Sequence, residues 1–384
     1  MLNFDLTEEQ IQIQETAKRF ANDVLQPLIW QAEETETFPR HLFKVAGELG
    51  LLGITYPIDV GGQGLDRVSD CLVREEISCM WQSFASSISG HSHLATWPIF
   101  SFGTETQKTE YLRPALAGEK IGSFALTEPE GGSDVRSIKT TAKRIGGDYV
   151  LNGSKCFITN APICDYVIVV AYTDQDAGMG GMSLFLVDRD TPGLVISDKM
   201  KKEGIRGSET AELYFEDCRI PAEGLIGLEE GRFPDVLRTL SIGRIGVAAN
   251  CLGIARGAYE TAREYAKERQ QFGRPIGSFQ GIAFKIADMV SGIEMARWMV
   301  YRTAWLADRG RPCDVEASMT KLLCSELAVS IAKEAVHILG GYGMMREFPV
   351  GRYLRDALVY ETGEGTSEIQ RSLIARSVLG FRSS

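Results

Sequence analysis

The sequence predicts a mainly helical protein with a central β domain. Three observations carry this prediction: helical apolar spacing before about residue 120, β-branched and aromatic runs from there to about 230, and long amphipathic stretches afterwards. We therefore expect an N-terminal helical domain (1–120), an antiparallel β-barrel (121–230) and a C-terminal four-helix bundle (231–384). With 384 residues, the chain is long enough for two or three domains and a large core.

The first part of the chain has the pattern of successive amphipathic helices. The run from Thr7 to Gln10 is typical of a helix start, with acidic residues in the first turn. Further helices are expected at 42–52, 67–80 and 105–117. The glycines of 61–64 break the pattern. Because no strand precedes them and no helix follows directly, they indicate a loop and not a phosphate cradle.

The middle part consists of strand-like runs separated by turns. Each run is rich in β-branched and aromatic residues. These runs cover 149–151, 156–159, 166–172, 183–187 and 211–215. The pairs Gly146-Gly147 and Asn152-Gly153 have turn character, so the region is expected to form a compact antiparallel barrel or sandwich.

The last part returns to helical spacing. Three long helices are expected at 233–270, 279–308 and 314–339, with a shorter one from about 366. Three long helices and a short one favour a bundle.

Composition excludes several classes of function. A net charge of -10 argues against a nucleic-acid surface, so an anionic ligand would need a local basic or dipolar site. The eight cysteines are scattered without a CxxC pair, and of the four histidines only His91 and His93 are close. A metal site is therefore not expected, and reduced thiols fit a cytosol-like compartment. The acidic start and the lack of a long apolar run predict a prokaryotic cytoplasmic enzyme with no membrane span; a mature mitochondrial form is the alternative.

A carboxylate flanked by glycines lies near the C-terminus. Glu364 stands between Gly363 and Gly365, which leave room for another molecule to approach it. Thr366 follows and is able to cap a helix whose N-terminus points at an anion or a polarised carbonyl. This arrangement suits a general base beside a substrate. On this run alone, a solvated loop carboxylate is the alternative.

Five segments together resemble the acyl-CoA dehydrogenase family, in family order and over essentially the whole chain. They are Leu126-Thr127-Glu128 with Gly131-Gly132-Ser133-Asp134, then 204–213, then 269–276 followed by Phe279-Gln280, then Gly340-Gly341-Tyr342-Gly343, and finally the Glu364 run. The resemblance implies a tightly bound FAD. It also implies that the flavin is contacted by residues near the β domain and by residues close to the base, namely Phe124, Leu126, Thr127, Ser133, Phe157, Thr159, Thr366 and Glu368.

Individual flavin contacts follow from the same resemblance. Ser133 would lie near the pyrophosphate, Phe157 would stack on the isoalloxazine where the family often has Trp, and Thr159 would bond near N5. A second group would reach the FAD of a neighbouring subunit, so the resemblance implies a homotetramer built as a dimer of dimers. This group comprises Arg269, Phe272 and Gln280. His337 stands where the family commonly has a Gln that faces the FAD adenine, and Gly340 and Gly341 would permit close approach of the backbone to the cofactor.

The resemblance also identifies residues for the substrate. Ser87, Gly90, His91 and Leu94 lie on the segment that usually lines the acyl pocket, and a structural role is the alternative for His91. Arg244 matches an arginine near the substrate, Ser241 replaces a frequent Asp that contacts CoA, and Gly365 follows the base.

Gly363 stands where many members of the family have Tyr. Its small size predicts space for an α-branched, cyclic or aromatic acyl group, unless Trp97 or Tyr360 fills the gap.

The implied reaction is the α,β-dehydrogenation of an acyl-CoA thioester. Glu364 would remove the α-proton, flavin N5 would accept the β-hydride, and an electron-transfer flavoprotein would take the electrons. A flavin oxidase or monooxygenase of the same fold, an enoyl-CoA reductase running in reverse, and a non-catalytic binding protein are the alternatives.

Overall fold

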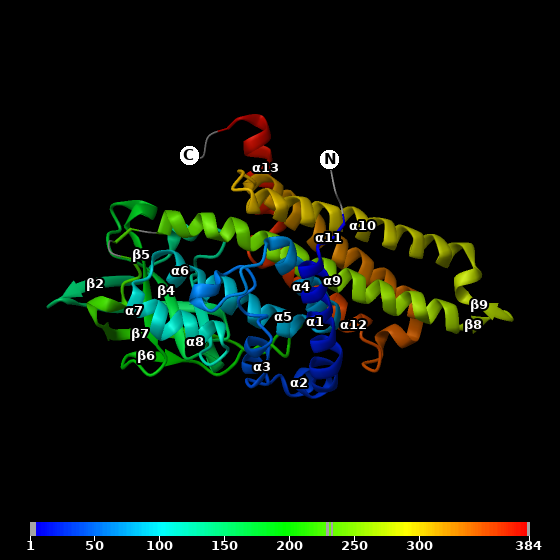
Figure 1. The fold of residues 1–384 in the computed structure, drawn as a ribbon, viewed down its shortest axis with the longest axis horizontal. Helices are drawn as coiled ribbons and strands as arrows, with labels where there is room; N and C mark the ends of the chain where they lie inside the picture. Colours follow the sequence, from blue (N-terminus) through cyan, green and yellow to red (C-terminus); the bar gives the residue numbers. More distant parts are fainter. Residues whose placement is uncertain (1–4, 228–229, 232, 382–384) are drawn as a thin grey trace.

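The computed structural model describes residues 5–227, 230–231 and 233–381, and within 233–242 it describes the backbone alone. Helices, a curled sheet and more helices follow one another along the chain, which confirms the predicted fold class (Figure 1). The helices preceding the sheet are α1 (Glu8–Phe20), α2 (Ile29–Thr35), α3 (Leu42–Glu48), α4 (Arg67–Met80), α5 (Gln82–Ser89), α6 (Trp97–Phe102), α7 (Glu105–Gln107) and α8 (Arg113–Leu116).

Helix α1 begins where the sequence indicates. The Thr7 side chain accepts the backbone N–H of Gln10, and the Gln10 side chain accepts that of Thr7, which completes a capping box. None of the helices in the described ranges is long and apolar enough to cross a membrane.

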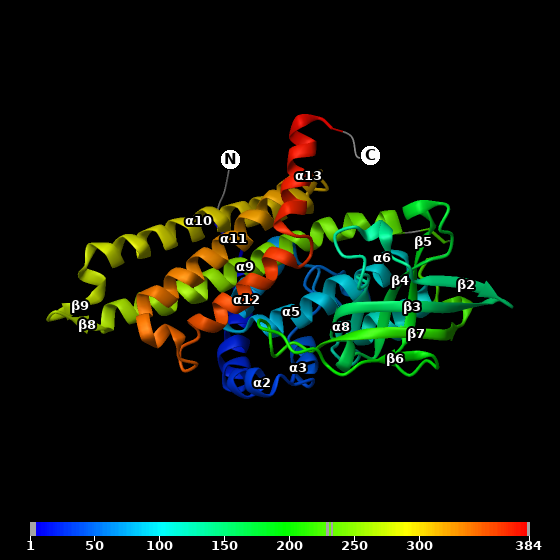
Figure 2. The same cartoon turned by 180° about the vertical axis from the view of Figure 1, so that it is seen from behind.

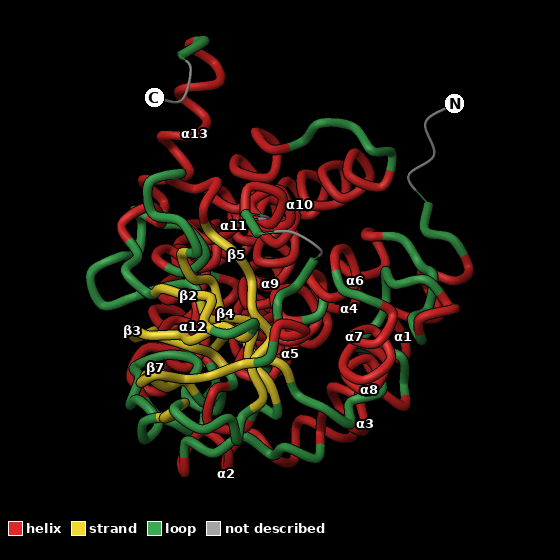
Figure 3. Tube along the Cα trace, turned by 90° about the vertical axis from the view of Figure 1, so that its left-hand side faces the viewer, coloured by secondary structure: helices red, strands yellow, loops and turns green. Residues whose placement is uncertain are grey.

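The sheet of the middle region curls beside the helices (Figure 3). Its strands are β1 (Gly122–Ala125), β2 (Thr141–Ile145), β3 (Asp148–Thr159), β4 (Tyr166–Tyr172), β5 (Met182–Asp188), β6 (Leu194–Ile196) and β7 (Thr210–Ile220). The order is β1-β4-β2-β3-β7-β6, with β5 paired to β4. Strands β1 and β2 run parallel to β4, and the other pairs are antiparallel. Strand β4 is buried along its whole length and forms the centre of this core.

The turn predicted at Asn152-Gly153 is wrong. Strand β3 runs straight through it, and the register with β7 shifts between Leu151 and Gly153. Gly153 has a φ of +146°, and a Cβ there would lie 2.5 Å from Oγ1 of Thr140. Glycine thus marks a bulge inside one long strand and not the end of a short one.

The C-terminal helices form a bundle that extends away from the sheet (Figure 2). The elements are α9 (Phe233–Glu268), the hairpin β8 (Gln270–Gln271) and β9 (Arg274–Pro275), α10 (Gln280–Asp308), α11 (Asp314–Leu339), α12 (Val350–Thr362) and α13 (Ser367–Leu379). Helix α12 packs on α9 and α11 and completes the bundle, whereas α13 contacts α11 and then projects from the body.

Helix α12 was not expected from the sequence. Its buried face carries Asp356 between Tyr353 and Tyr360, and the Asp356 carboxylate accepts the backbone N–H of Ile205 at 2.6 Å. Its apolar residues nevertheless recur at helical spacing, so the pattern is present in the sequence.

Helices α4 and α9 approach each other through glycines. A Cβ on Gly253 would lie 2.5 Å from the carbonyl oxygen of Glu75, and one on Gly257 would lie 2.5 Å from that of Cys79. This close backbone packing places the polar side chains of α4 next to α9.

Candidate active site

Glu364 lies in the turn between α12 and α13, with its backbone in the left-handed region. Its φ is +53°, and that of Gly365 is +95°. Non-glycine residues adopt this conformation at a cost, and they gather at functional sites. Glycine is favoured at the next position because residues with a side chain rarely adopt such a φ; a Cβ there would also lie 2.6 Å from the side-chain nitrogen of Gln370. The predicted helix cap is confirmed, since the Thr366 side chain accepts the backbone N–H of Ile369.

Solvent reaches the Glu364 side chain, although protein atoms crowd around its carboxylate. This crowding has the largest effect and raises the pKa of the carboxyl above its usual value. Three cations from different helices oppose the shift: Arg74 on α4, Lys321 on α11 and Arg244 on α9. The net shift of the pKa is upward. A carboxylate with a raised pKa that solvent can reach suits proton abstraction.

Helix α9 meets Glu364 and Arg74 through glycines one turn apart. A Cβ on Gly243 would lie 3.6 Å from Oε2 of Glu364, and one on Gly246 would lie 3.0 Å from the guanidinium carbon of Arg74. Arg244 lies between these glycines in the sequence. Burial lowers the pKa of Arg244, and Asp314 and Glu364 raise it in part. The structure therefore brings the predicted base and the predicted substrate arginine together.

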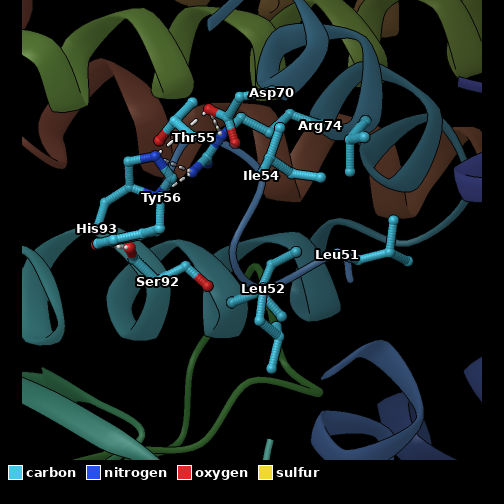
Figure 4. Close-up of a pocket in the computed structure, with 11 residues that line it drawn as sticks. Leu51, Leu52, Ile54, Thr55, Tyr56, Asp70, Arg74, Ser92 and His93 are labelled. Carbon is cyan, nitrogen blue, oxygen red and sulfur yellow. Dashed lines mark hydrogen bonds and ion pairs between the residues drawn. The ribbon is translucent and has the colours of Figure 1, made fainter. Parts of the chain in front are cut away.

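Arg74 belongs to a buried polar cluster that the sequence did not reveal (Figure 4). Its guanidinium donates to Asp70 at 2.8 Å and to Ser89 at 2.6 Å, and it lies 2.5 Å from Nδ1 of His93. Asp70 also approaches His93 at 3.4 Å. A cavity of about 10 Å³, which is roughly the space of one water, lies next to this cluster. Ser92 lines it together with Asp70, Arg74 and His93. The cluster neutralises the Arg74 charge locally, so its field at Glu364 is reduced.

The segment after β1 is clamped against β3. The backbone N–H of Cys156 donates to the Thr127 carbonyl at 2.9 Å. The Lys155 ammonium donates to the Leu126 carbonyl at 3.0 Å and to Glu128 at 2.7 Å. Lys155 is fully buried and Glu128 nearly so. Leu126 and Thr127 are therefore held in place by contacts inside the chain.

Phe157 is presented to solvent by a bulge. Its φ is +59°, its side chain is 65% exposed, and the β3–β7 register shifts between Lys155 and Ile158. A large aromatic ring in a strained backbone at the surface is the arrangement expected of a ligand platform. Thr159 follows, and a Cβ on Gly90 would lie 3.5 Å from its methyl group, so the predicted acyl and flavin segments are adjacent.

Five further predicted residues differ in their surroundings. Phe124 on β1 and Leu94 in a π-helical turn are half-buried. Ser133 is exposed beyond the clamped segment, and Glu368 is exposed in the first turn of α13. Ser241 lies on α9, and its side chain is outside the described residues.

Both ring nitrogens of His91 are used inside the protein. Nδ1 accepts the backbone N–H of Gly122 at 2.9 Å, so Nε2 carries the proton and donates to the Ala115 carbonyl at 3.0 Å. Burial lowers the pKa of His91 to about 4, so the ring is neutral at neutral pH. Ser87 is also buried, with its hydroxyl 2.9 Å from that of Ser208. These contacts account for His91 as a structural residue, and no polar atom of the ring is left for a substrate.

The remaining predicted flavin contacts lie at the opposite end of the bundle, and all of them are exposed (Figure 1). They are Arg269, Phe272, Gln280, His337, Gly340 and Gly341. Phe272, at the tip of the β8–β9 hairpin, has a φ of +50° and is 92% exposed. The guanidinium of Arg269 lies 5.8 Å from the centre of the Tyr342 ring, which joins the hairpin to the 340–344 turn. One chain does not bring this group to Glu364 or Phe157.

The surroundings of Gly363 are open on all sides but one. Its φ of -71° is open to any residue, and a Cβ there would lie 3.0 Å from the carbonyl oxygen of Val359, a tight contact, with only the Val359 carbonyl group within 4 Å. The two side chains considered as fillers are engaged elsewhere. Trp97 packs against Tyr56 and Phe100, and the Tyr360 hydroxyl accepts a hydrogen bond from Gln82.

Comparison with known proteins agrees with this geometry. The acyl-CoA dehydrogenase N-terminal, middle and C-terminal domain models match residues 7–119, 123–218 and 233–379. A probable acyl-CoA dehydrogenase of Bacillus subtilis is 46% identical over 379 residues, which cover 98% of this chain and 100% of the relative. The chain belongs to the acyl-CoA dehydrogenase family.

Two further similarities concern substrate and partner. A short-chain specific acyl-CoA dehydrogenase of Clostridium acetobutylicum is 41% identical over 377 residues, covering 98% of this chain and 100% of that protein. A chain solved in work on the electron transferring flavoprotein of Acidaminococcus fermentans has a TM-score of 0.96 and 42% identity, covering 98% of this chain and 100% of that one.

As an acyl-CoA dehydrogenase, the protein is an oxidoreductase whose cofactor is FAD. Its residues fit this cofactor. Phe157 offers an exposed aromatic face, and a Cβ on Gly132 or Gly341 would meet no atom within 4 Å, so there is room beside the backbone there for a ligand to approach.

Lys321 and Arg74 are the site residues that sequence reasoning missed. A signal for Lys321 exists, because it falls on the buried face of α11 that also carries Ala317, Cys324 and Ala328. A lysine on such a face must bond inside the protein.

Proposed function

We propose that this acyl-CoA dehydrogenase converts a short acyl-CoA thioester to the 2-enoyl-CoA, with Glu364 as the base. One observation carries the proposal: a solvent-accessible carboxylate, in a left-handed turn between glycines, has a pKa raised by its surroundings. Bound FAD supplies the hydride acceptor, and an electron-transfer flavoprotein takes the electrons. The similarity to a chain solved in work on such a flavoprotein supports this partner.

Glu364 removes the α-proton, and the electrons of the broken C–H bond move toward the thioester oxygen. The backbone N–H of Glu364 is expected to donate to that oxygen. The charges of Arg244 and Lys321 act on Glu364 and favour its ionised form, which is the form that takes a proton. Turnover then depends on holding the Glu364 carboxylate in a fixed position relative to the α-carbon of the substrate.

We further propose that two chains complete each FAD site, in a homotetramer built as a dimer of dimers. The predicted FAD contacts fall into two groups at different ends of the bundle, and the far group is wholly exposed. An exposed aromatic tip such as Phe272 is costly unless another surface covers it. A second copy of the chain would cover it and would gain the missing cofactor contacts.

The acyl group is expected to be short or medium in length and to be branched or cyclic near the thioester. The relative from Clostridium acetobutylicum supports a short chain. The space beside Gly363 supports extra bulk near the α and β carbons.

An anaerobic titration of the yellow protein with acyl-CoAs tests the reaction. The panel contains straight short and medium chains, 2-methyl-branched acyls, and cyclohexane- and aryl-substituted acyls. Flavin absorbance is expected to bleach with short thioesters, and this bleaching is expected to disappear in Glu364→Gln while FAD stays bound.

The outcomes are distinct. No bleaching with any thioester, despite bound FAD, would remove the proposed reaction and the role of Glu364. Bleaching followed by rapid reoxidation in air, with peroxide formed, would instead indicate an oxidase.

A further inference from the structure

The backbone around Glu364 needs support from outside its own turn. Two consecutive residues, Glu364 and Gly365, are in left-handed conformations, and the first of them is not a glycine. The turn contains no regular hydrogen-bond ladder, because α12 ends at Thr362 and α13 begins at Ser367. A strained segment of this kind persists only when surrounding contacts fix it.

Lys321 provides such contacts from α11. Its ammonium donates to the carbonyl of Tyr360 at 2.7 Å and to the carbonyl of Gly365 at 2.7 Å. These two carbonyls lie on either side of Glu364 in the chain. Gln370 adds a weaker contact from α13, donating to the Gly365 carbonyl at 3.1 Å. The last turn of α12 and the residue after the base are thus tied to one charged group.

The placement of Lys321 is unusual for a lysine. The side chain is fully buried, within a helix face whose other members are small or apolar. Burying an ammonium is unfavourable unless hydrogen bonds or charges compensate it. The two carbonyls compensate it in part, and the charge of Glu364 does so as well. A methionine of similar length would fill the same space at no such cost, so packing alone does not explain the lysine.

We propose that Lys321 is a positioning residue for Glu364, holding the carboxylate where it meets the α-carbon of the substrate. The proposal rests on the proposed function, in which Glu364 is the base. Lys321 itself does not contact the reacting atoms. It acts by fixing the ends of the turn and by placing a positive charge near the carboxylate.

The electrostatic part of this role has a definite sign. Arg74 from α4, Arg244 from α9 and Lys321 from α11 all favour the ionised form of Glu364. Arg74 is already paired with Asp70, and Cys251, Glu361 and Arg244 are the other groups that act on Lys321. Removing the Lys321 charge is therefore expected to move the titration of Glu364 to higher pH.

The test isolates proton abstraction from the redox step. Acetyl-CoA has α-hydrogens and no β-carbon, so the holoenzyme is able to exchange its α-hydrogens with D2O but not to dehydrogenate it. In each exchange Glu364 takes a proton, the substrate forms its enolate, and a deuteron returns to carbon. The rate is followed by mass spectrometry as a function of pH, in wild type, Glu364→Gln, Lys321→Met and Thr320→Val.

Thr320→Val is the matched control. Thr320 is the preceding residue on α11, is equally buried, and bonds to Thr303 and Glu316 and not to the base turn. Its loss removes a buried hydrogen bond from the same helix. Exchange and its pH midpoint are expected to stay at wild-type values in this variant.

Lys321→Met is expected to lower the exchange rate on the order of 100-fold, as a small displacement of a reacting group does. It is also expected to shift the pH midpoint upward while FAD content and acetyl-CoA binding stay close to wild type. A purely structural role would reduce FAD content or thermal stability and leave the rate per bound FAD and the midpoint unchanged. That result would overturn the proposal.

Two provisions keep the outcomes separable. If Lys321→Met does not retain FAD, Lys321→Gln is measured, which keeps a donor without the charge; an unchanged rate and midpoint in that variant would overturn the proposal. If wild type itself shows no exchange, the proposed function fails. If wild type exchanges, Glu364→Gln does not, and Lys321→Met matches wild type, only the role of Lys321 fails.

Discussion

Predicted site residues lie in two very different environments. Glu364 is surrounded by side chains from several helices, whereas the tip of the β8–β9 hairpin is exposed. Around Glu364, side chains from α4, α9 and α11 converge, and Lys321 ties down the turn. At the hairpin, Phe272 is 92% exposed. Both Glu364 and Phe272 have left-handed backbones. The difference supports the proposal that one chain supplies the groups around Glu364, whereas the hairpin serves the FAD site of another copy of the chain.

The largest expected effect comes from breaking the contacts that clamp the segment after β1, with Leu126 and Thr127, against β3. Lys155→Met leaves Glu128 as a buried charge without its cation, at a cost of about 3–5 kcal/mol in the free energy of unfolding. Urea unfolding of the FAD-loaded protein measures this. Lys139→Met is the control, because its partner Glu130 is exposed and no change is expected. Equal behaviour of the two variants would show that the segment is not held by the buried pair.

Next in size is the loss of an aromatic contact at the far end. Phe272→Ala is expected to leave the unfolding of the chain unchanged, because the ring is exposed, and to weaken FAD retention by about 2 kcal/mol, as for a central interface residue. FAD release on dilution measures the second effect. Ile58→Ala, also highly exposed, serves as the control. Unchanged FAD release in Phe272→Ala would remove the hairpin from the cofactor site.

An effect of similar size concerns selectivity near Glu364. Gly363→Tyr is expected to lower kcat/KM for branched or cyclic acyl-CoAs relative to straight ones by about 10- to 200-fold, because the ring would take the space beside the base. Kinetics on paired substrates of equal carbon number measure the ratio. An equal loss on both classes would contradict the space-filling explanation.

The smallest expected effect is on stability. Because the folded-state pKa of Glu364 is raised, its contribution to stability is fully present below the ordinary pKa of a glutamate and is lost as pH rises through the folded value. Glu364→Gln does not ionise, so it is expected to have a higher Tm than wild type at neutral pH and an equal Tm below about pH 4.

Glu368→Gln provides a control of opposite sign. Its backbone N–H and the Thr366 side chain lower the pKa of Glu368 in the first turn of α13, so this variant is expected to lose a little stability at neutral pH. A lower Tm for Glu364→Gln at neutral pH would show that ionisation of Glu364 does not destabilise the folded state, which would contradict the raised pKa.

The sequence predicted those features that depend on local pattern. Helix α1 begins at its capping box, the three long helices lie close to their expected bounds, and β4 covers the predicted apolar run 166–172. Helix α12 was missed although its apolar residues recur at helical spacing, and β3 was split at Asn152-Gly153 because a bulge and a turn use the same residues.

A family motif names Glu364 and Arg244, whose roles stay predictions, but no motif names residues that come together only where helices meet in space. Arg74 and Lys321 are 247 residues apart in the sequence (321 − 74), yet both lower the pKa of Glu364. No local sequence pattern indicates that two such distant residues lie near each other. The isolated lysine in the apolar face of α11 was the one visible signal.

Complementation between two inactive variants tests the central claim that two chains complete each site. One variant is Glu364→Gln; the other is Arg269→Ala combined with Phe272→Ala, which disables the hairpin. In a mixed dimer, one site carries both defects and the other carries neither. Co-expression in equal amounts is therefore expected to restore about a quarter of wild-type activity, given random pairing of symmetric subunits. Activity no higher than that of the separate variants would contradict the account.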